Sequence, residues 1–165
     1  MKFFRWLFFF VFLVIGNANA MSVGDKVPDC KLRELNSLSD TLSFNKYQGE
    51  VIYVDFWASW CPPCTKSFPY MNHLHNKLKN KGLKIIAVNL DEVVNDANSF
   101  LTKSSADFMT LYDQDQECAK SFDVKAMPST YLVDKKGVVR YIHLGFKDSE
   151  IEELQFMVNK LLAEK

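Results

Sequence analysis

The chain has 165 residues, of which 20 are basic and 20 acidic, so its formal net charge is zero. This length predicts one domain with one core once a short leader is set aside. The balanced charge argues against nucleic acid as a partner, because nucleic-acid binding calls for a clustered basic face.

The first 20 residues have the three parts of a secretory signal peptide. Lys2 and Arg5 give a positively charged start, residues 6–15 are an uninterrupted apolar run, and residues 18–20 (Ala-Asn-Ala) form a small-residue cleavage site. The apolar run is shorter than the roughly 20 residues that span a bilayer. We therefore expect a cleaved signal peptide over residues 1–20 rather than an uncleaved inner-membrane anchor. Export places the mature protein in the periplasm, where disulfides can form.

The mature chain, residues 21–165, is expected to form a single domain. It begins with an entry segment, residues 22–29, that shows no periodicity. Two short alternating runs, residues 30–35 and 41–44, lie on either side of an Asn-Ser pair. They predict an N-terminal β-hairpin.

The stretch VIYVDFWASWCPPCTKSFP, residues 51–69, is the most informative part of the sequence. Its first seven residues are β-branched or aromatic apart from Asp55, which predicts a buried strand that continues to Trp60. Cys61 and Cys64 follow, separated by two prolines. Apolar residues at helical spacing then predict a helix. These residues are Phe68, Met71, Leu74 and Leu78.

The order of strand, dithiol and helix favours thiol chemistry. A cysteine in the first turn of a helix lies against unpaired N–H groups and the positive end of the helix dipole, and both stabilise the thiolate that attacks disulfides. The spacing lets Cys64 reach Cys61 within one turn and resolve a mixed disulfide formed there. Pro62 and Pro63 fit the first turn but remove two donors to the thiolate. Since no basic residue lies between the cysteines, we expect a bias toward reductant.

The rest of the chain alternates strand and helix patterns, which predicts βαβ units and a small mixed sheet with helices on both faces. The final two strands are expected on either side of residues 134–137, whose Asp-Lys-Lys-Gly sequence has the chemistry of a hairpin turn. Expected strands are 83–89, 108–112, 129–133 and 138–144, and expected helices are 91–103, 116–122 and a last helix that begins at Asp148 as its N-cap.

The motif WASWCPPC, with the sequence Met-Pro-Ser-Thr at 127–130 before a strand, resembles the thioredoxin superfamily. More narrowly, it is similar to the exported TlpA/ResA-like thiol-disulfide oxidoreductases. The resemblance covers residues 27–162. It implies that residues 21–165 are a thioredoxin-like domain with an α/β thioredoxin fold, in which helices flank a mixed central sheet. It also implies the N-terminal β-hairpin and a helix-strand insertion over residues 91–112.

The resemblance implies roles for the residues around the dithiol. Cys61 is expected to be the exposed nucleophile, and Cys64 the buried resolving thiol. Pro128 matches the family's cis-proline, which lies with Met127 against the dithiol and offers backbone to an extended substrate. A proline directly before a strand fits this position, because it cannot donate a hydrogen bond to the ladder. Trp60 is expected either to shield one side of the dithiol or to serve packing alone.

Asp55 is a carboxylate that alternates inward in an otherwise apolar strand. Burial there would remove it from water and raise its pKa. By the resemblance, it matches the buried aspartate of thioredoxin, which passes protons to and from the resolving cysteine. Many TlpA/ResA-like proteins carry a neutral residue at this place. The alternative is an aspartate that faces solvent at the end of the strand.

Three further features qualify this prediction. Family members often carry a glutamate three residues after the second cysteine, where this chain has Ser67, and this departure weakens the analogy to members dedicated to cytochrome c maturation. Cys30 and Cys118 either form a structural disulfide or are two separate buried thiols. None of the three histidines has metal-site spacing with the cysteines, so no metal or other cofactor is expected.

We therefore expect an exported thiol-disulfide oxidoreductase that reduces disulfides of client proteins by dithiol-disulfide exchange at Cys61 and Cys64. By the resemblance, its partners are client proteins with cysteines or disulfides, and a membrane thiol-disulfide relay is its electron donor. One competing class, the peroxiredoxin-like peroxide reductases, places a single peroxidatic cysteine after a threonine. Another, the copper-handling thiol proteins, uses C-x-x-x-C spacing to hold Cu(I). The CPPC sequence fits neither pattern.

Overall fold

The computed structural model describes residues 20–35 and 42–164. The predicted signal peptide lies outside the described residues apart from Ala20, and so does the turn of the predicted N-terminal hairpin. No helix within these two ranges is long and apolar enough to cross a membrane.

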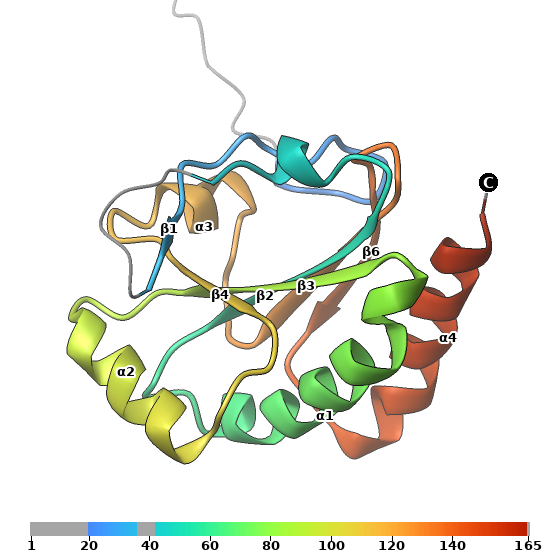
Figure 1. Cartoon of the computed structure of the whole chain (residues 1–165). Helices are drawn as coiled ribbons and strands as arrows, with labels where there is room; N and C mark the ends of the chain where they lie inside the picture. Colours follow the sequence, from blue (N-terminus) through green and yellow to red (C-terminus); the bar gives the residue numbers. More distant parts are fainter. Residues whose placement is uncertain (1–19, 36–41, 165) are drawn as a thin grey trace, which may run out of the picture.

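A six-stranded mixed sheet forms the centre of the molecule (Figure 1), in the order β1-β4-β3-β2-β5-β6. The three strands β4, β3 and β2 are parallel, whereas β5, β6 and β1 each pair antiparallel with their neighbours. The sheet confirms the predicted fold class. The strands are β1 Arg33–Glu34, β2 Val51–Trp57, β3 Leu83–Asn89, β4 Met109–Tyr112, β5 Ser129–Val133 and β6 Val139–Leu144.

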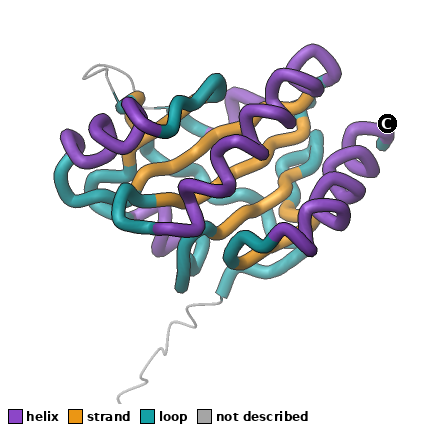
Figure 2. Tube along the Cα trace, turned by 90° about the horizontal axis from the view of Figure 1, so that it is seen from below, coloured by secondary structure: helices purple, strands orange, loops and turns teal. Residues whose placement is uncertain are grey.

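Helices cover both faces of the sheet. Figure 1 shows α1 and α2 below the strands and α4 at the right, and the view from below shows helices in front of the strands (Figure 2). The short helix α3 and the 3-10 turn η1 lie on the opposite face with the N-terminal segment. The bounds are α1 Pro62–Leu78, α2 Val94–Lys103, α3 Glu117–Ser121, α4 Ile151–Ala163 and η1 Phe44–Tyr47.

Strand β2 supplies side chains to both layers of the core, because successive residues of a strand point to opposite faces. Tyr53 and Trp57 belong to the layer next to α1 and α4. Val54 and Phe56 belong to the layer next to η1 and α3. Every residue of β2 is buried, which explains why its sequence is an apolar run and not a polar-apolar alternation.

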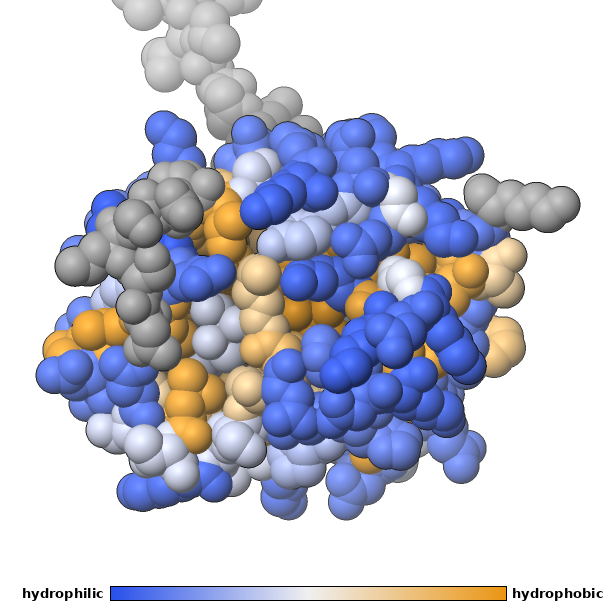
Figure 3. Space-filling model, viewed as in Figure 1, coloured by the Kyte–Doolittle hydropathy of each residue, from blue (hydrophilic) through white to orange (hydrophobic). Residues whose placement is uncertain are grey.

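Hydrophilic side chains cover most of the face shown in Figure 3. Among the described residues, only five large hydrophobic side chains are strongly exposed. They are Val23, Trp60, Val93, Leu144 and Phe156. Trp60 directly precedes Cys61 in the chain, so its exposure bears on the site described below.

The predicted strands 83–89 and 129–133 are confirmed with the same bounds in β3 and β5. The predicted end of the central strand at Trp60 is wrong, because β2 ends at Trp57. The chain turns immediately afterwards, where the N–H group of Cys61 donates to the carbonyl of Ala58 at 3.2 Å.

Two other predictions about the chain's path also need correction. The N-terminal hairpin is reduced, within the described residues, to one antiparallel bridge between Leu32 and Leu42. Arg33–Glu34 pairs instead with β4 at the edge of the sheet. Asp148 is not an N-cap, since it begins the 3-10 turn η3 (Asp148–Glu150) that precedes α4.

Candidate active site

The cysteine pair lies where the chain passes from β2 into α1. Cys61 and Cys64 are joined by a disulfide, and their Cα atoms are 5.4 Å apart. Cys61 is the N-cap of α1, and Pro62 and Pro63 occupy its first two positions, where a missing N–H group costs little. The predicted order of strand, dithiol and helix is confirmed.

In this disulfide state Cys61 is 4% exposed and Cys64 is fully buried. The expectation of an exposed Cys61 is therefore not met in the oxidised protein, in which its sulfur is bonded to that of the fully buried Cys64. Cys61 nevertheless lines a surface groove, and Cys64 does not. A partner that enters the groove would therefore meet Cys61.

The groove has a volume of about 640 Å³ and is formed by two walls and a residue that joins them. The first wall is the segment from Trp60 to Pro63, and the second is α3 with the loop that follows it, as far as Met127. Leu90, directly after β3, joins the walls. Its N–H group donates to the carbonyl of Trp57 at 2.9 Å, and its carbonyl accepts from the amide of Gln116 at 3.4 Å.

The three residues expected to contact a substrate lie at different depths. Trp60 is 68% exposed on the first wall. Met127 lines the second wall and is half-buried, whereas Pro128 is buried. The bond between Met127 and Pro128 is cis, as predicted. The structure thus brings Trp60, Cys61 and Met127 to one groove, with Pro128 next to the groove and not in its lining.

Asp55 is fully buried in the middle of β2, so the alternative of a solvent-facing aspartate is wrong. By the alternation of the strand it points to the same face as Tyr53 and Trp57, which is the layer that contains Cys64. Its Oδ1 accepts a hydrogen bond from the Thr130 hydroxyl at 2.7 Å, and its Oδ2 has no partner among the described residues.

Burial raises the pKa of the Asp55 carboxyl to about 7, and the hydrogen bond from Thr130 opposes part of this rise. A carboxyl with this pKa exchanges its proton near neutral pH. Such a group can act as either an acid or a base under ordinary conditions.

Cys30 and Cys118 form a second disulfide, with Cα atoms 5.2 Å apart. The question left open by the sequence is thus decided in favour of a bridge. It ties the entry segment to α3, and the next two residues of α3, Ala119 and Lys120, line the groove. The bridge is therefore attached to the second wall.

Sequence reasoning missed a set of buried polar residues at the same end of the sheet. Asp91 follows β3 and accepts hydrogen bonds from Ser59 and Asn89. Asp113 follows β4 and accepts from the N–H groups of Cys118 and Ala119. The available signal was an aspartate just beyond each strand.

Ser67 also has a defined place. It is buried, and its hydroxyl donates to the carbonyl of Cys64 at 3.1 Å. It therefore contributes a hydrogen bond within α1 and no acidic group. Residues 20–35 and 42–164 contain no cluster of three or more His, Cys, Asp or Glu side chains suited to a metal ion.

Comparison with known proteins identifies the family. The Redoxin family matches residues 22–157. The thiol-disulfide oxidoreductase ResA of Geobacillus kaustophilus is 33% identical over 131 residues, which are 79% of this chain and 74% of the relative. ResA of Bacillus subtilis is 31% identical over 132 residues, which are 80% of this chain and 73% of the relative.

A solved structure agrees with these relatives. A Chlorobium tepidum protein whose crystal structure carries the name of the thiol:disulfide interchange protein DsbE has a TM-score of 0.82 and 37% sequence identity. The match covers 87% of this chain and 100% of that protein. The predicted resemblance is thereby confirmed: the chain belongs to the Redoxin family of the thioredoxin superfamily and is a thiol-disulfide oxidoreductase similar to ResA and DsbE.

Proposed function

We propose that this thiol-disulfide oxidoreductase reduces disulfides in client proteins through Cys61 and Cys64. The observation that carries the proposal is the position of Cys61, which caps α1 and lines the groove while Cys64 lies buried behind it. Client proteins with cysteines or disulfides are the partners that this arrangement suits.

The reaction has two exchange steps. In the reduced protein, the Cys61 thiolate attacks one sulfur of a client disulfide, and the other client sulfur leaves as a thiolate. Cys64 then attacks the Cys61 sulfur, which releases the second client thiolate and forms the Cys61–Cys64 disulfide. Two electrons pass from the dithiol to the client, and the protein ends in the oxidised state described above.

Asp55 is proposed to accept the proton of Cys64 before the second step. A buried thiol must lose its proton to attack, and a nearby base with a pKa near that of the surroundings is suited to take it. By the alternation of β2, Asp55 points into the core layer that contains Cys64, and one of its oxygens has no hydrogen-bond partner among the residues that the structure describes. The burial that raises its pKa to about 7 supports this role.

The first turn of α1 supports the reducing direction of electron flow. Pro62 and Pro63 stand at its first two positions and have no N–H groups. A Cys61 thiolate therefore lacks two donors that would stabilise it, and a less stabilised thiolate makes the dithiol a better reductant.

The groove is proposed as the client site. Trp60 offers an exposed aromatic surface on the first wall. Across the groove, the backbone N–H and C=O groups of Met127 have no hydrogen-bond partner within the described part of the chain. Such groups can pair with an extended client segment, with Pro128 holding Met127 in place.

We infer that the protein acts in the periplasm and that residues 1–20 are its cleaved signal peptide, leaving residues 21–165 as the thioredoxin-like domain. The charged start, apolar run and small-residue end of the leader support this inference. The Cys30–Cys118 disulfide fits an oxidising compartment. A membrane thiol-disulfide relay is the proposed electron donor that returns the dithiol to its reduced state.

Trapping with the Cys64→Ala variant tests the proposal. Without Cys64 the second step cannot occur, so Cys61 should stay bound to clients and to the electron donor as mixed disulfides. These are detected as adducts on non-reducing gels that disappear after dithiothreitol. The control is Cys61→Ala/Cys64→Ala, which should form none. Equal adducts from the double variant, or none from Cys64→Ala, would refute the assignment of Cys61 as nucleophile.

A further inference from the structure

Two buried aspartates stand beside the groove, and the thiol chemistry uses neither of them. Asp91 follows β3 and Asp113 follows β4, and each is 3% exposed. Neither forms an ion pair with a lysine, arginine or histidine of the described residues. A buried carboxylate without a cation costs stability unless hydrogen bonds compensate it, and each of these two aspartates accepts several.

Asp91 holds the first wall. Its two oxygens accept from the N–H group of Ser59 at 3.1 and 3.0 Å, and one of them also accepts from the Ser59 hydroxyl at 2.9 Å. Ser59 lies directly before Trp60 in the turn that presents Cys61. The carboxylate therefore fixes the segment that begins this wall.

Asp113 holds the second wall. Its oxygens accept from the N–H group of Cys118 at 3.3 Å and from that of Ala119 at 2.8 Å. Ala119 lines the groove. Burial raises the pKa of Asp113, and these two hydrogen bonds oppose the rise. The carboxylate thus fixes the start of α3, which carries the wall.

The two aspartates are joined through Asn89, the last residue of β3. The N–H group of Asp113 donates to the carbonyl of Asn89 at 3.1 Å. The side-chain amide of Asn89 donates to Asp91 at 2.8 Å. One hydrogen-bonded framework therefore connects both walls, and Leu90, the residue between Asn89 and Asp91, lines the groove.

We propose that Asp91 and Asp113 are positioning residues that hold the two walls at the separation a client chain needs. They act through Ser59 and α3, and they touch neither the client nor the reacting sulfurs. This inference rests on the proposed use of the groove as the client site. In this proposal, the affinity for a client chain depends on the hydrogen-bonded framework. The reactivity of Cys61 toward a small disulfide does not depend on the framework.

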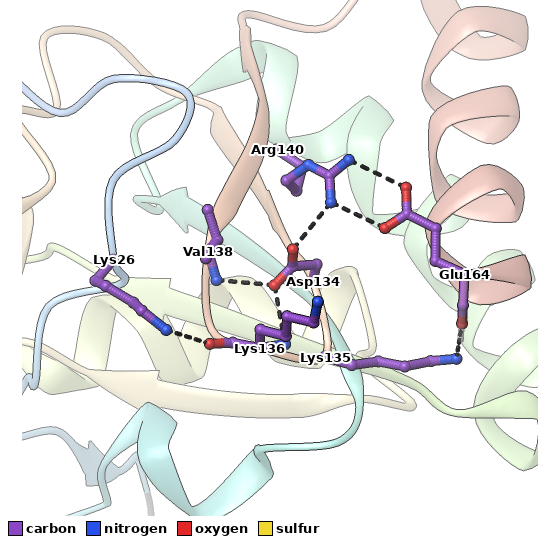
Figure 4. A network of polar contacts seen from close by, with 7 residues as sticks. All are labelled: Lys26, Asp134, Lys135, Lys136, Val138, Arg140 and Glu164. Carbon is purple, nitrogen blue, oxygen red and sulfur yellow. Dashed lines mark hydrogen bonds and ion pairs between the residues drawn. The ribbon is translucent and has the colours of Figure 1, made fainter.

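A third buried aspartate offers a matched control. Asp134 is 7% exposed and lies at the other end of β5, away from the dithiol. It accepts from the N–H groups of Lys136 and Val138 and from Arg140, which also pairs with Glu164 (Figure 4). Asp134→Ala therefore removes a buried aspartate that is also held by several hydrogen bonds, but it leaves the groove intact.

The experiment compares two substrates of the reduced, full-length protein in single turnovers. One is a short synthetic peptide whose single cysteine, flanked by apolar residues, forms a mixed disulfide with 5-thio-2-nitrobenzoate. The other is Ellman's reagent, which offers the same leaving group without a peptide. Attack by Cys61 releases the coloured thiolate in both cases, and Cys64 then displaces the second group. The half-saturating concentration and the limiting rate are measured separately.

In Asp91→Ala and in Asp113→Ala, we expect the half-saturating peptide concentration to rise about tenfold while the rate with Ellman's reagent changes less than about twofold. Asp134→Ala should lower the melting temperature and leave the half-saturating peptide concentration unchanged. The double variant Asp91→Ala/Asp113→Ala should show less than the product of the single effects, because both residues support the same groove.

The proposal is overturned if the half-saturating peptide concentration stays within about twofold of the wild-type value in both single variants. It is also overturned if Asp134→Ala raises this concentration as much as Asp91→Ala and Asp113→Ala do. Should Asp91→Ala fail to fold, Ser59→Ala removes only the hydroxyl bond and should give a smaller rise of the same kind. The double variant Cys61→Ala/Cys64→Ala, which removes both thiols of the pair, separates the two levels of inference. If it still releases the coloured thiolate as wild type does, the proposed function is wrong, whereas an inactive double variant with unchanged wall variants refutes the positioning role alone.

Discussion

Replacing Asp55 with asparagine should change how the stability of the protein depends on pH. The carboxyl has a pKa of about 7 in the folded protein, against 3.8 for an ordinary aspartate. Between these values the folded state holds a proton that the unfolded state has lost, so the free energy of unfolding falls as pH rises through this window. Below pH 3.8 the stability is fully present, and above about 7 the loss is complete.

The size of the effect follows from the two pKa values. A difference of about 3 pKa units corresponds to about 4 kcal/mol of unfolding free energy lost between about pH 4 and pH 8. The asparagine side chain keeps an oxygen that can accept the hydrogen bond from Thr130, but it cannot ionise. Asp55→Asn should therefore not lose unfolding free energy in this way as pH rises. Its amide nitrogen has no partner, which costs about 1–3 kcal/mol at every pH and does not affect the slope.

Urea unfolding of the oxidised proteins at about pH 4, 6 and 8 measures this difference. The free energy of unfolding of Asp55→Asn minus that of wild type should increase by about 4 kcal/mol from pH 4 to pH 8. The same variant should slow the attack of Cys64 on a mixed disulfide at Cys61, because the proposed proton acceptor is gone. Parallel stability curves would refute the raised pKa, and an unchanged rate of the second step across pH would refute the proton transfer.

Three other substitutions test the disulfide, the groove and the core. Replacing Cys30 and Cys118 together by alanine should lower the free energy of unfolding by about 4 kcal/mol, since the bridge joins residues 88 apart in the sequence; an unchanged urea midpoint would contradict this. Trp60→Ala should leave the urea midpoint nearly unchanged, because the side chain is exposed, yet weaken peptide binding. Equal binding would remove Trp60 from the client site. Phe68→Ala should cost about 3–5 kcal/mol in urea unfolding, because the ring packs against Trp57 and Phe100, and a loss below about 1 kcal/mol would contradict that packing.

The central strands were predictable because their sequences are unusual. β3 (LKIIAVN) and β5 (STYLV) are short runs rich in apolar and β-branched residues, and both are buried on two faces. Their shortness and β-branched content favour a buried strand over a helix. The turn at 134–137 was also predictable, and the hydrogen bond from Gly137 to the carbonyl of Asp134 closes it at 2.9 Å.

The edges of the fold were harder to predict. Arg33–Glu34 is exposed, so no hydrophobic pattern specifies its partner, and the sequence-local hairpin was the natural guess. The structure pairs it with β4 instead, a choice that depends on the position of β4 at the open edge of the parallel strands. The end of β2 was placed three residues too late for a similar reason. Its turn is held by Asp91, which lies 32 residues beyond Ser59.

The site residues also differ in how predictable they were. Local sequence motifs identified Cys61, Cys64 and the Met127–Pro128 bond. Asp55 was identified because it is the one charged residue in an otherwise apolar strand. The Cys30–Cys118 bridge and the framework of Asp91 and Asp113 depend on residues that meet only after folding.

The register of the sheet explains why these separate pieces meet. β2 and β3 are parallel, and Trp57 stands beside Asn89 at their carboxyl ends. β5 runs the other way, so its first residue, Ser129, stands beside Phe56. The segments after β2 and β3 and before β5 are therefore forced to the same end of the sheet, which brings the dithiol, the aspartates and Pro128 together. A shift of either pairing by one residue would move the walls relative to Cys61, so the groove depends on strand register as much as on the residues that line it.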